Sequence, residues 1–135
     1  MFSEQILEYE KRIEWIDEEL ENLKSSLDRL DIAEVDTAGS ITGIGDMQMY
    51  LMGAVKKAYE RGSHLGIMQM YLAEMEQLIA GNSFQRMSQS VNDVNVEIQK
   101  ERENCEEQIR NLENERCLCV EERHRLIQLE EMNSV

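Results

Sequence analysis

Cysteine and histidine are the residue types in this chain best suited to metal binding, and their spacing decides whether they can act together. Cys117 and Cys119 are separated by a single residue, and His124 follows them on the same predicted helix. Residues i and i+2 of a helix point about 200° apart, so two thiolates at this spacing do not converge on one ion. We therefore expect Cys119 to pack inside a helical seam, Cys117 to face outward, and no metal to be bound.

Catalysis by a nucleophile needs a base and a carboxylate within reach of it, and the sequence offers no recognisable set of this kind. His64 lies beside glycines, and His124 lies on a charged face. The many Asp and Glu residues follow positions that are typical of solvated helix surfaces. We therefore expect no catalytic residue, no cofactor and no enzymatic activity.

A glycine-rich segment, DIAEVDTAGSITGIG at residues 31–45, raises the question of a phosphate-binding loop. Its glycines do not follow the G-x-G-x-x-G spacing and no Gly-Lys-Ser/Thr follows them. Asp46 stands where a phosphate would need a hydrogen-bond donor. The segment also lacks the helical periodicity of the residues before it, and we interpret residues 32–45 as a connecting loop.

The net charge of −14 limits the partners that the chain can bind. A strongly acidic chain is repelled by phosphate backbones and by anionic membrane surfaces, so we expect no nucleic-acid partner. The longest uncharged stretch, Gly62–Ala73, is too short to span a bilayer, so we expect no membrane insertion. A basic protein surface is the partner that this charge favours.

The amino terminus, MFSEQILEYEKR, lacks the basic start and the apolar block of a secretory signal. The chain has three cysteines, and an odd number argues against a disulfide framework. A reducing compartment is the simpler interpretation, so we expect a cytoplasmic protein. If the protein leaves the cell, we expect export without a cleavable signal peptide.

The distribution of glycine and the absence of proline predict a few long helices. All seven glycines lie between Gly39 and Gly81, and no proline interrupts the chain. The predicted elements are a helix at about 3–31, the loop at 32–45, a helix at about 46–80 that is either continuous or broken near 61–66, and a helix at about 83–131. The predicted fold class is all-α. A single domain, residues 1–135, forms an elongated hairpin or bundle of three or four helices, with antiparallel coiled-coil pairing of the terminal helices.

Both terminal helices carry apolar residues at alternating steps of three and four, the pattern of a coiled-coil seam. The seam of the first helix is complete: Ile6, Tyr9, Ile13, Ile16, Leu20, Leu23, Leu27 and Leu30. The third helix has one full row of apolar or cysteine residues: Phe84, Val91, Ile98, Cys105, Leu112, Cys119 and Leu126. We interpret its second row as Met87, Val94, Glu101, Gln108, Glu115, Glu122 and Leu129, which is polar through the middle, with Ile109 on a neighbouring row. Because this helix is also longer than the first, we expect part of it to bind another partner.

An internal repeat, MQMYL, occurs at Met47–Leu51 and again at Met68–Leu72. The offset between the copies is three heptads, so both copies present the same face if the helix is continuous. Methionine fills cores and also adapts to protein-binding patches, and for the set as a whole we weigh core above partner surface. Met49 and Met70 fall outside the main seam and are the better candidates for a partner surface.

Trp15 lies at an outer position of the first helix, between the seam residues Ile13 and Ile16. An outward tryptophan either packs under another helix of the same chain or anchors a second protein. The sequence weighs these alternatives equally, and Trp15 is a candidate for partner binding.

The segment YLMGAVKKAY, from Tyr50 to Tyr59, follows an acidic coiled-coil helix and precedes a long helix rich in Glu and Arg. In this order of elements the chain resembles small helical proteins of type VII secretion in Gram-positive bacteria, which include WXG-type proteins and the helical accessory partners of LXG-domain toxins. A Trp-x-Gly turn joins the two helices of WXG-type proteins. Here Leu51-Met52-Gly53 stands in that place, with leucine instead of tryptophan, and Tyr59 follows.

The resemblance implies a targeting factor or chaperone that binds the helical amino-terminal region of an effector and helps to present it to the secretion machine. We therefore expect a non-enzymatic protein whose partner is either the amino-terminal domain of an LXG-type toxin or a second small helical protein. The alternative is a self-associating coiled-coil scaffold or adaptor, a homodimer with no part in secretion. The candidates for partner binding are Trp15, Met49, Tyr50, Gly53, Tyr59, Met70, Ile109, Leu112 and Leu126.

Overall fold

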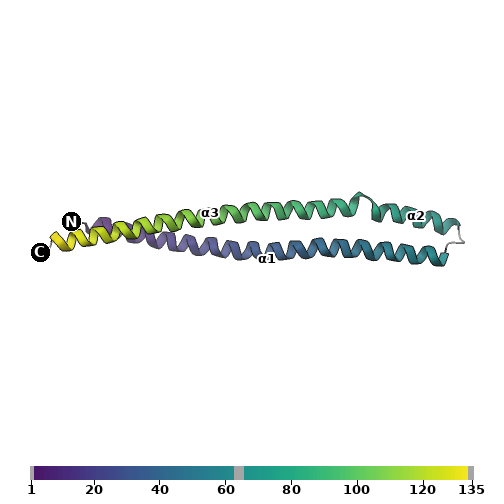
Figure 1. Cartoon of the computed structure of the whole chain (residues 1–135), viewed down its shortest axis with the longest axis horizontal. Coiled ribbons are helices and arrows are strands. Elements are labelled where there is room, and N and C mark those ends of the chain that lie inside the picture. The colour runs from purple at the N-terminus through teal and green to yellow at the C-terminus, as the bar shows by residue number, and fades with distance from the viewer. Residues whose placement is uncertain (1, 63–65, 134–135) are drawn as a thin grey trace. The chain divides into compact units, whose positions relative to one another are not determined.

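The computed structural model describes residues 2–62 and 66–133, and every one of them except Phe2 and Gly81 is helical. The described chain is therefore all-α, as the sequence predicts. The helices are α1 (Ser3–Gly62), α2 (Gly66–Ala80) and α3 (Asn82–Asn133), as Figure 1 shows. His64 and the predicted seam residue Leu65 lie outside the described residues.

The chain divides into two compact units where the sequence leads us to expect one domain. The terminal unit consists of Met1–Asp31 and Lys100–Val135, and the middle unit consists of Ile32–Gln99. The terminal unit therefore pairs the first half of α1 with most of α3. The middle unit contains the rest of α1, all of α2 and the start of α3.

The loop predicted at residues 32–45 is wrong, because α1 runs through this segment as a helix. The seam of the first helix continues at the same alternating steps beyond Leu30, and each of these positions is buried or half-buried. The positions are Glu34, Thr37, Ile41, Ile44, Gln48, Leu51, Val55 and Ala58. Polar residues at three of them hide the pattern in the sequence. Burial of this face outweighs the low helix propensity of the glycines.

Hydroxyl groups in the same segment bond to the helix that carries them. Thr37 donates a hydrogen bond of 2.7 Å to the carbonyl oxygen of Ala33, and Thr42 donates one of 3.1 Å to that of Ala38. These bonds reach back four residues, so the hydroxyl groups are satisfied without ending the helix. Thr37 is thereby buried with its polar atom paired.

The segment predicted at about 46–80, as a helix either continuous or broken near 61–66, is divided in the structure between α1, which ends at Gly62, and α2, which begins at Gly66. Residues 63–65, within the expected break at 61–66, lie outside the described part of the chain. The turn that the family resemblance implies at Leu51-Met52-Gly53 is absent, because these residues lie inside α1. A Cβ at Gly53 would meet nothing within 4 Å, so nothing in the packing there requires glycine.

The core of the terminal unit forms around the predicted seam of the first helix. Ile16 is fully buried, and Leu20 and Cys119 pack with it. The half-buried residues against this cluster are Tyr9, Ile13, Ile109 and Leu112. The predicted burial of Cys119 and exposure of Cys117 are both confirmed.

The second seam row predicted for the third helix is wrong by one residue over its first four positions, whereas its last three, Glu115, Glu122 and Leu129, are half-buried. Met87 and Val94, which belong to the predicted row, are exposed. The positions one residue later are half-buried: Ser88, Asn95, Arg102, Ile109, Arg116, Arg123 and Glu130. Arginine can occupy such positions because its aliphatic stem covers apolar surface while its guanidinium reaches solvent or a carboxylate.

These arginines form ion pairs with acidic residues of α1. Arg123 lies 2.8 Å from Glu10, Arg116 lies 2.6 Å from Asp17, and Arg102 pairs with Asp31. We call these three pairs the ladder. The first two pairs are seven residues apart in each helix, and the third follows after fourteen. At the skipped step between them, the same spacing would set Lys24 against Ile109. The order of the pairs in α3 is the reverse of their order in α1.

The expectation that the third helix is longer than its intrachain neighbour is also wrong. α1 has 60 residues and α3 has 52. The first helix was predicted to stop at about residue 31 because its polar and glycine-bearing continuation hides the seam. The length of the third helix therefore gives no reason to expect a partner.

In the middle unit, α2 packs against the C-terminal part of α1 (Figure 1). The buried residues are Val55, Leu72 and Ile79, and those packed around them are Leu51, Met52, Ala58, Tyr59 and Phe84. The side-chain amide of Gln48 donates a hydrogen bond of 3.0 Å to the carbonyl oxygen of Ile79, near the end of α2. Seam residues from both helices therefore form the core of this unit.

Gly81 separates α2 from α3. No described glycine has a positive φ, so Gly81 does not form a left-handed cap. Its requirement is steric, because a Cβ there would lie 2.7 Å from the carbonyl oxygen of Gln77. The chain passes too close to the last turn of α2 to admit a side chain.

Candidate partner-binding surface

Trp15, the aromatic candidate in the terminal unit, has a contact within its own chain. The guanidinium of Arg12 lies 4.3 Å from the centre of the Trp15 ring, and Arg12 also forms a 2.7 Å ion pair with Glu115 of α3. Trp15 nevertheless remains 44% exposed. The indole is therefore held in place by a cation–π contact, and part of its surface stays open.

The three candidates on α3 are occupied by the core of the terminal unit. Ile109 and Leu112 pack against Ile16 and its neighbours, and Leu126 is buried. Their apolar surface is already covered by α1. These residues therefore stabilise the unit and offer little area to a second protein.

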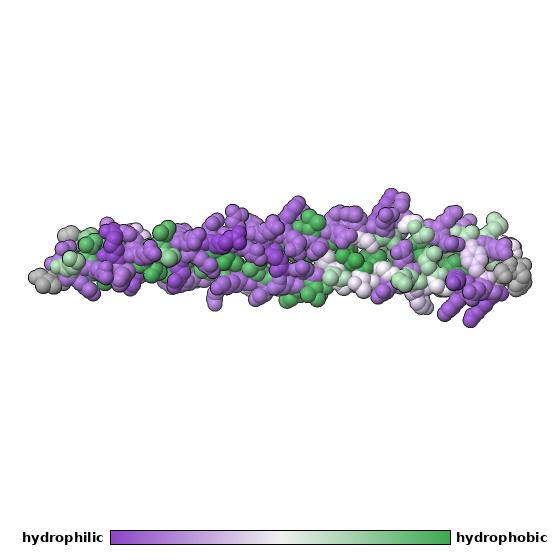
Figure 2. Space-filling view, viewed as in Figure 1, coloured by the Kyte–Doolittle hydropathy of each residue, from purple (hydrophilic) through white to green (hydrophobic). Residues whose placement is uncertain are grey.

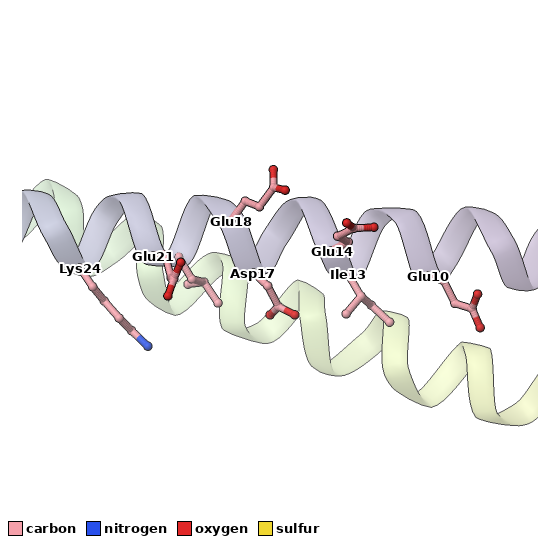
Figure 3. Close-up of a pocket in the computed structure, with 8 residues that line it drawn as sticks. Glu10, Ile13, Glu14, Asp17, Glu18, Glu21 and Lys24 are labelled. Carbon is pink, nitrogen blue, oxygen red and sulfur yellow. The ribbon is translucent and has the colours of Figure 1, made fainter.

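A hollow of about 510 Å³ runs along α1 in the same unit (Figure 3). It is lined by Ile13, Leu20, Lys24 and five carboxylates: Glu10, Glu14, Asp17, Glu18 and Glu21. Figure 3 shows Ile13 and Asp17 directed toward α3 and Glu18 directed away from it. Glu10 and Asp17 are committed to the ladder. The hollow is the charged flank of a helix pair and does not form an enclosed site.

Electrostatic effects in the terminal unit follow from its ion pairs and from burial. The hydrogen bond from Arg125 lowers the pKa of the Glu122 carboxyl, and the bond to Asp17 raises the pKa of Arg116. Burial, with Glu101 and Glu106 nearby, raises the pKa of the Cys105 thiol. The shifts favour the charged forms of Glu122 and Arg116 and the neutral form of Cys105. In residues 2–62 and 66–133, no three His, Cys, Asp or Glu side chains are grouped to hold a metal ion.

The two MQMYL copies display the same residues to solvent, one on α1 and one on α2. The third residue of each copy is Met49 or Met70, exposed by 75% and 70%. The fourth is Tyr50 or Tyr71, exposed by 76% and 63%. The final leucine turns inward in both copies: Leu51 is half-buried and Leu72 is buried. The repeat therefore gives the middle unit two exposed Met-Tyr pairs.

Gly53 and Tyr59 lie elsewhere in the middle unit. Together with Met52, Val55, Lys56, Glu60 and Glu76 they line a hollow of about 460 Å³. Tyr59 also packs against the core around Val55. These two candidates are brought together by α1, and their surface is separate from the exposed Met-Tyr pairs.

One apolar surface that sequence reasoning missed is the outer face of α2. Ile67, Tyr71 and Leu78 recur at helical spacing and are 74%, 63% and 70% exposed. Glu74 lies in the same stripe, and Ile67, Met70, Tyr71 and Glu74 line a hollow of about 450 Å³. We call Ile67, Met70, Tyr71, Glu74 and Leu78 the outer stripe. The signal was present in the sequence as a second row of apolar residues beside the row that packs on α1.

The surface view places this apolar character over the middle unit. In Figure 2 pale and green atoms gather around α2 and the adjacent part of α1, whereas hydrophilic residues, in purple, cover most of the visible face of the terminal unit. None of the described helices is long and apolar enough to cross a membrane. Comparisons of the chain with protein-family models, with curated proteins and with solved structures find no match.

Proposed function

We propose that this chain is a non-enzymatic protein that binds a helical partner through its middle unit. The observation that carries the proposal is the second apolar stripe of α2. A surface helix ordinarily has one apolar stripe, which faces the core. α2 uses Leu72 and Ile79 for that purpose and still exposes the outer stripe.

A protein partner fits this stripe better than a lipid surface does. Helices that lie on membranes carry Lys and Arg beside their apolar face, which attract anionic lipids. α2 has no basic residue and contains Glu74 and Glu76. The net charge of −14 adds to the repulsion from an anionic membrane.

In this proposal the terminal unit is an antiparallel coiled coil with a structural role, and the middle unit carries the binding surface. The reversed order of the ladder and the alternating seam of buried residues support this pairing. Its seam is filled, and it exposes fewer large apolar side chains than the middle unit does.

The resemblance to accessory proteins of type VII secretion supplies the partner for the proposal: the helical amino-terminal region of an LXG-type toxin. In this role the chain acts as a targeting factor or chaperone that covers apolar effector helices before export. The test is co-expression of the full chain with such a toxin domain from the same organism, followed by affinity purification and sedimentation. A stoichiometric complex is expected, and failure of the two chains to copurify would overturn the secretion role.

Self-association is the second candidate, because the exposed Met-Tyr pairs and the outer stripe are apolar surfaces that a second copy could cover. Light scattering on the purified chain separates the two functions. A homodimer at micromolar concentration, in which the second copy covers these apolar surfaces, supports the function as a self-associating scaffold. A monomer removes the scaffold and leaves the apolar surface for another protein.

A further inference from the structure

The outer stripe contains one charged side chain among apolar neighbours, and that charge restricts what can cover the stripe. Glu74 shares its hollow with Ile67, Met70 and Tyr71. Within the described part of the chain Glu74 has no ion-pair partner, and α2 contains no Lys or Arg that could supply one. Among residues 2–62 and 66–133, the Glu74 carboxylate is therefore exposed and has no cation beside it.

A helix that covers this stripe removes water from Glu74. Burial of an unpaired carboxylate is costly, whereas a carboxylate paired with a cation across the interface can be accommodated. The occupant must therefore bring a basic residue to the middle of the stripe. A second copy that docks its own α2 brings Glu74 and Glu76 and no cation, which disfavours that arrangement.

We infer that the outer stripe binds an amphipathic helix of another protein that carries a Lys or Arg beside its apolar face, paired with Glu74. The stripe extends over twelve residues from Ile67 to Leu78. The eleven steps between them, at 1.5 Å each, give about 17 Å, which matches about three turns of a partner helix. Leu78 and Ile67 bind the ends of its apolar face, and Met70 and Tyr71 bind the centre. This inference rests on the proposed function and names its surface and the chemistry of its partner.

The test uses the full chain and two synthetic helical peptides of about four turns, each with leucine at positions i, i+3, i+4 and i+7. One peptide has lysine beside the centre of the leucine stripe, and the other has glutamate there. Fluorescence anisotropy is expected to show the lysine peptide binding about tenfold more tightly than the glutamate peptide at low salt. Glu74→Lys is expected to reverse this preference, and Leu78→Ser to weaken the binding of both peptides.

Two matched variants make the result specific to the outer stripe. Glu76→Gln changes the other carboxylate of α2, which lines a different hollow, and is expected to keep the preference for the lysine peptide. Leu7→Ser removes an exposed leucine of the terminal unit and is expected to leave both affinities unchanged. Circular dichroism of each variant confirms that it remains helical.

Three results would overturn the inference. The first is that neither peptide binds, and the second is that the preference is unchanged in Glu74→Lys. The third is a homodimer of the wild-type chain that Leu78→Ser dissociates, since a second copy would then cover the stripe. If a toxin domain copurifies but Glu74→Lys has no effect on peptide preference, this inference fails and the proposed function stands. If the preference reverses but no toxin domain copurifies, the secretion role fails and this surface stands.

Discussion

Glycine has opposite consequences at two positions of the middle unit. At Gly81 a Cβ would lie 2.7 Å from the carbonyl oxygen of Gln77, so a side chain forces the backbone to move. At Gly53 nothing lies within 4 Å of that position, and glycine only weakens α1. The sequence identifies Gly81 as a helix end, but only the structure shows that the reason is close approach and not a left-handed backbone.

Gly81→Ala is expected to lower the free energy of unfolding by about 1–3 kcal/mol, the usual range for an overpacked site. Gly53→Ala is expected to raise it by about 0.5–1 kcal/mol, because alanine has the higher helix propensity. Urea denaturation followed by circular dichroism measures both. Equal effects of the two substitutions would contradict the steric account of Gly81.

The three thiols differ in exposure and in charge environment. Cys117 is exposed, whereas Cys105 and Cys119 are buried. Burial and the neighbouring Glu101 and Glu106 raise the pKa of Cys105, so a smaller fraction of this thiol is thiolate at any given pH. The sequence predicts which of Cys117 and Cys119 faces inward, because the two lie on different faces of one helix.

Maleimide labelling of the native chain near neutral pH is expected to modify Cys117 first. Cys105 and Cys119 react at the rate at which the terminal unit opens, so urea removes the difference between the three. Mass spectrometry of the digested protein assigns each site, and Cys117→Ser provides the control that lacks the fast phase. Fast labelling of Cys105 in the folded chain would show that its side chain is accessible.

The sequence predicts a helix wherever apolar residues occupy the seam positions. It does not predict one where polar residues occupy those positions. Ile16 and Leu20 reveal the first half of α1 by their spacing alone. Thr37 and Gln48 occupy the same row and are satisfied by hydrogen bonds to carbonyl oxygens, which a pattern of apolar residues does not register. In α3 the half-buried second row is made mostly of polar residues such as Arg116, so a pattern of apolar residues does not reveal it.

The ladder can be tested by exchanging the charges of one pair. Arg116→Asp sets two carboxylates together and is expected to lower the melting temperature slightly, because the pair is exposed to solvent. The double substitution of Asp17→Arg with Arg116→Asp restores the pair and is expected to recover most of that loss. Thermal denaturation of the wild type, both single variants and the double variant gives the coupling energy.

Glu18→Arg is the matched control for this exchange, because Figure 3 shows Glu18 directed away from α3. It changes the net charge as Asp17→Arg does, but it has no ladder partner. Combining it with Arg116→Asp is expected to recover no stability beyond the sum of the single effects. Recovery equal to that of the Asp17 exchange would mean that net charge, and not the ladder, governs the result.

For the molecule as a whole, the net charge of −14 opposes compaction. Added salt screens this repulsion and so stabilises the fold. Exposed ion pairs contribute little to stability, so their screening by salt costs little. The melting temperature is therefore expected to rise between about 0.01 M and about 0.3 M NaCl, as the Debye length falls. Circular dichroism measures it, and a neutral osmolyte at matched osmolarity is the control. A fall with added salt would mean that ion pairing outweighs the repulsion.

The candidate site was only partly accessible from the sequence. Met49, Tyr50 and Met70 were selected because they fall off the seam or lie in the repeat, and the structure leaves all three exposed. Leu126 belongs to the predicted full row of the third helix and Ile109 to the row beside it, and the structure places both in the interior of the terminal unit. The sequence does not single out the outer stripe, because its apolar residues lie beside the row of α2 that packs on α1.

The skipped step of the ladder determines which register the two helices can adopt. A repeat of seven would ordinarily permit one helix to slip by one heptad and find new partners. With the observed pairing, a slip in either direction sets Lys24 against an arginine, Arg116 or Arg102. It also sets an aspartate, Asp31 or Asp17, against Ile109. Each slip by one heptad therefore replaces an ion pair with two like charges or with a charge opposite an apolar residue. The position where Lys24 lies opposite Ile109, which has no ion pair, thus disfavours both alignments.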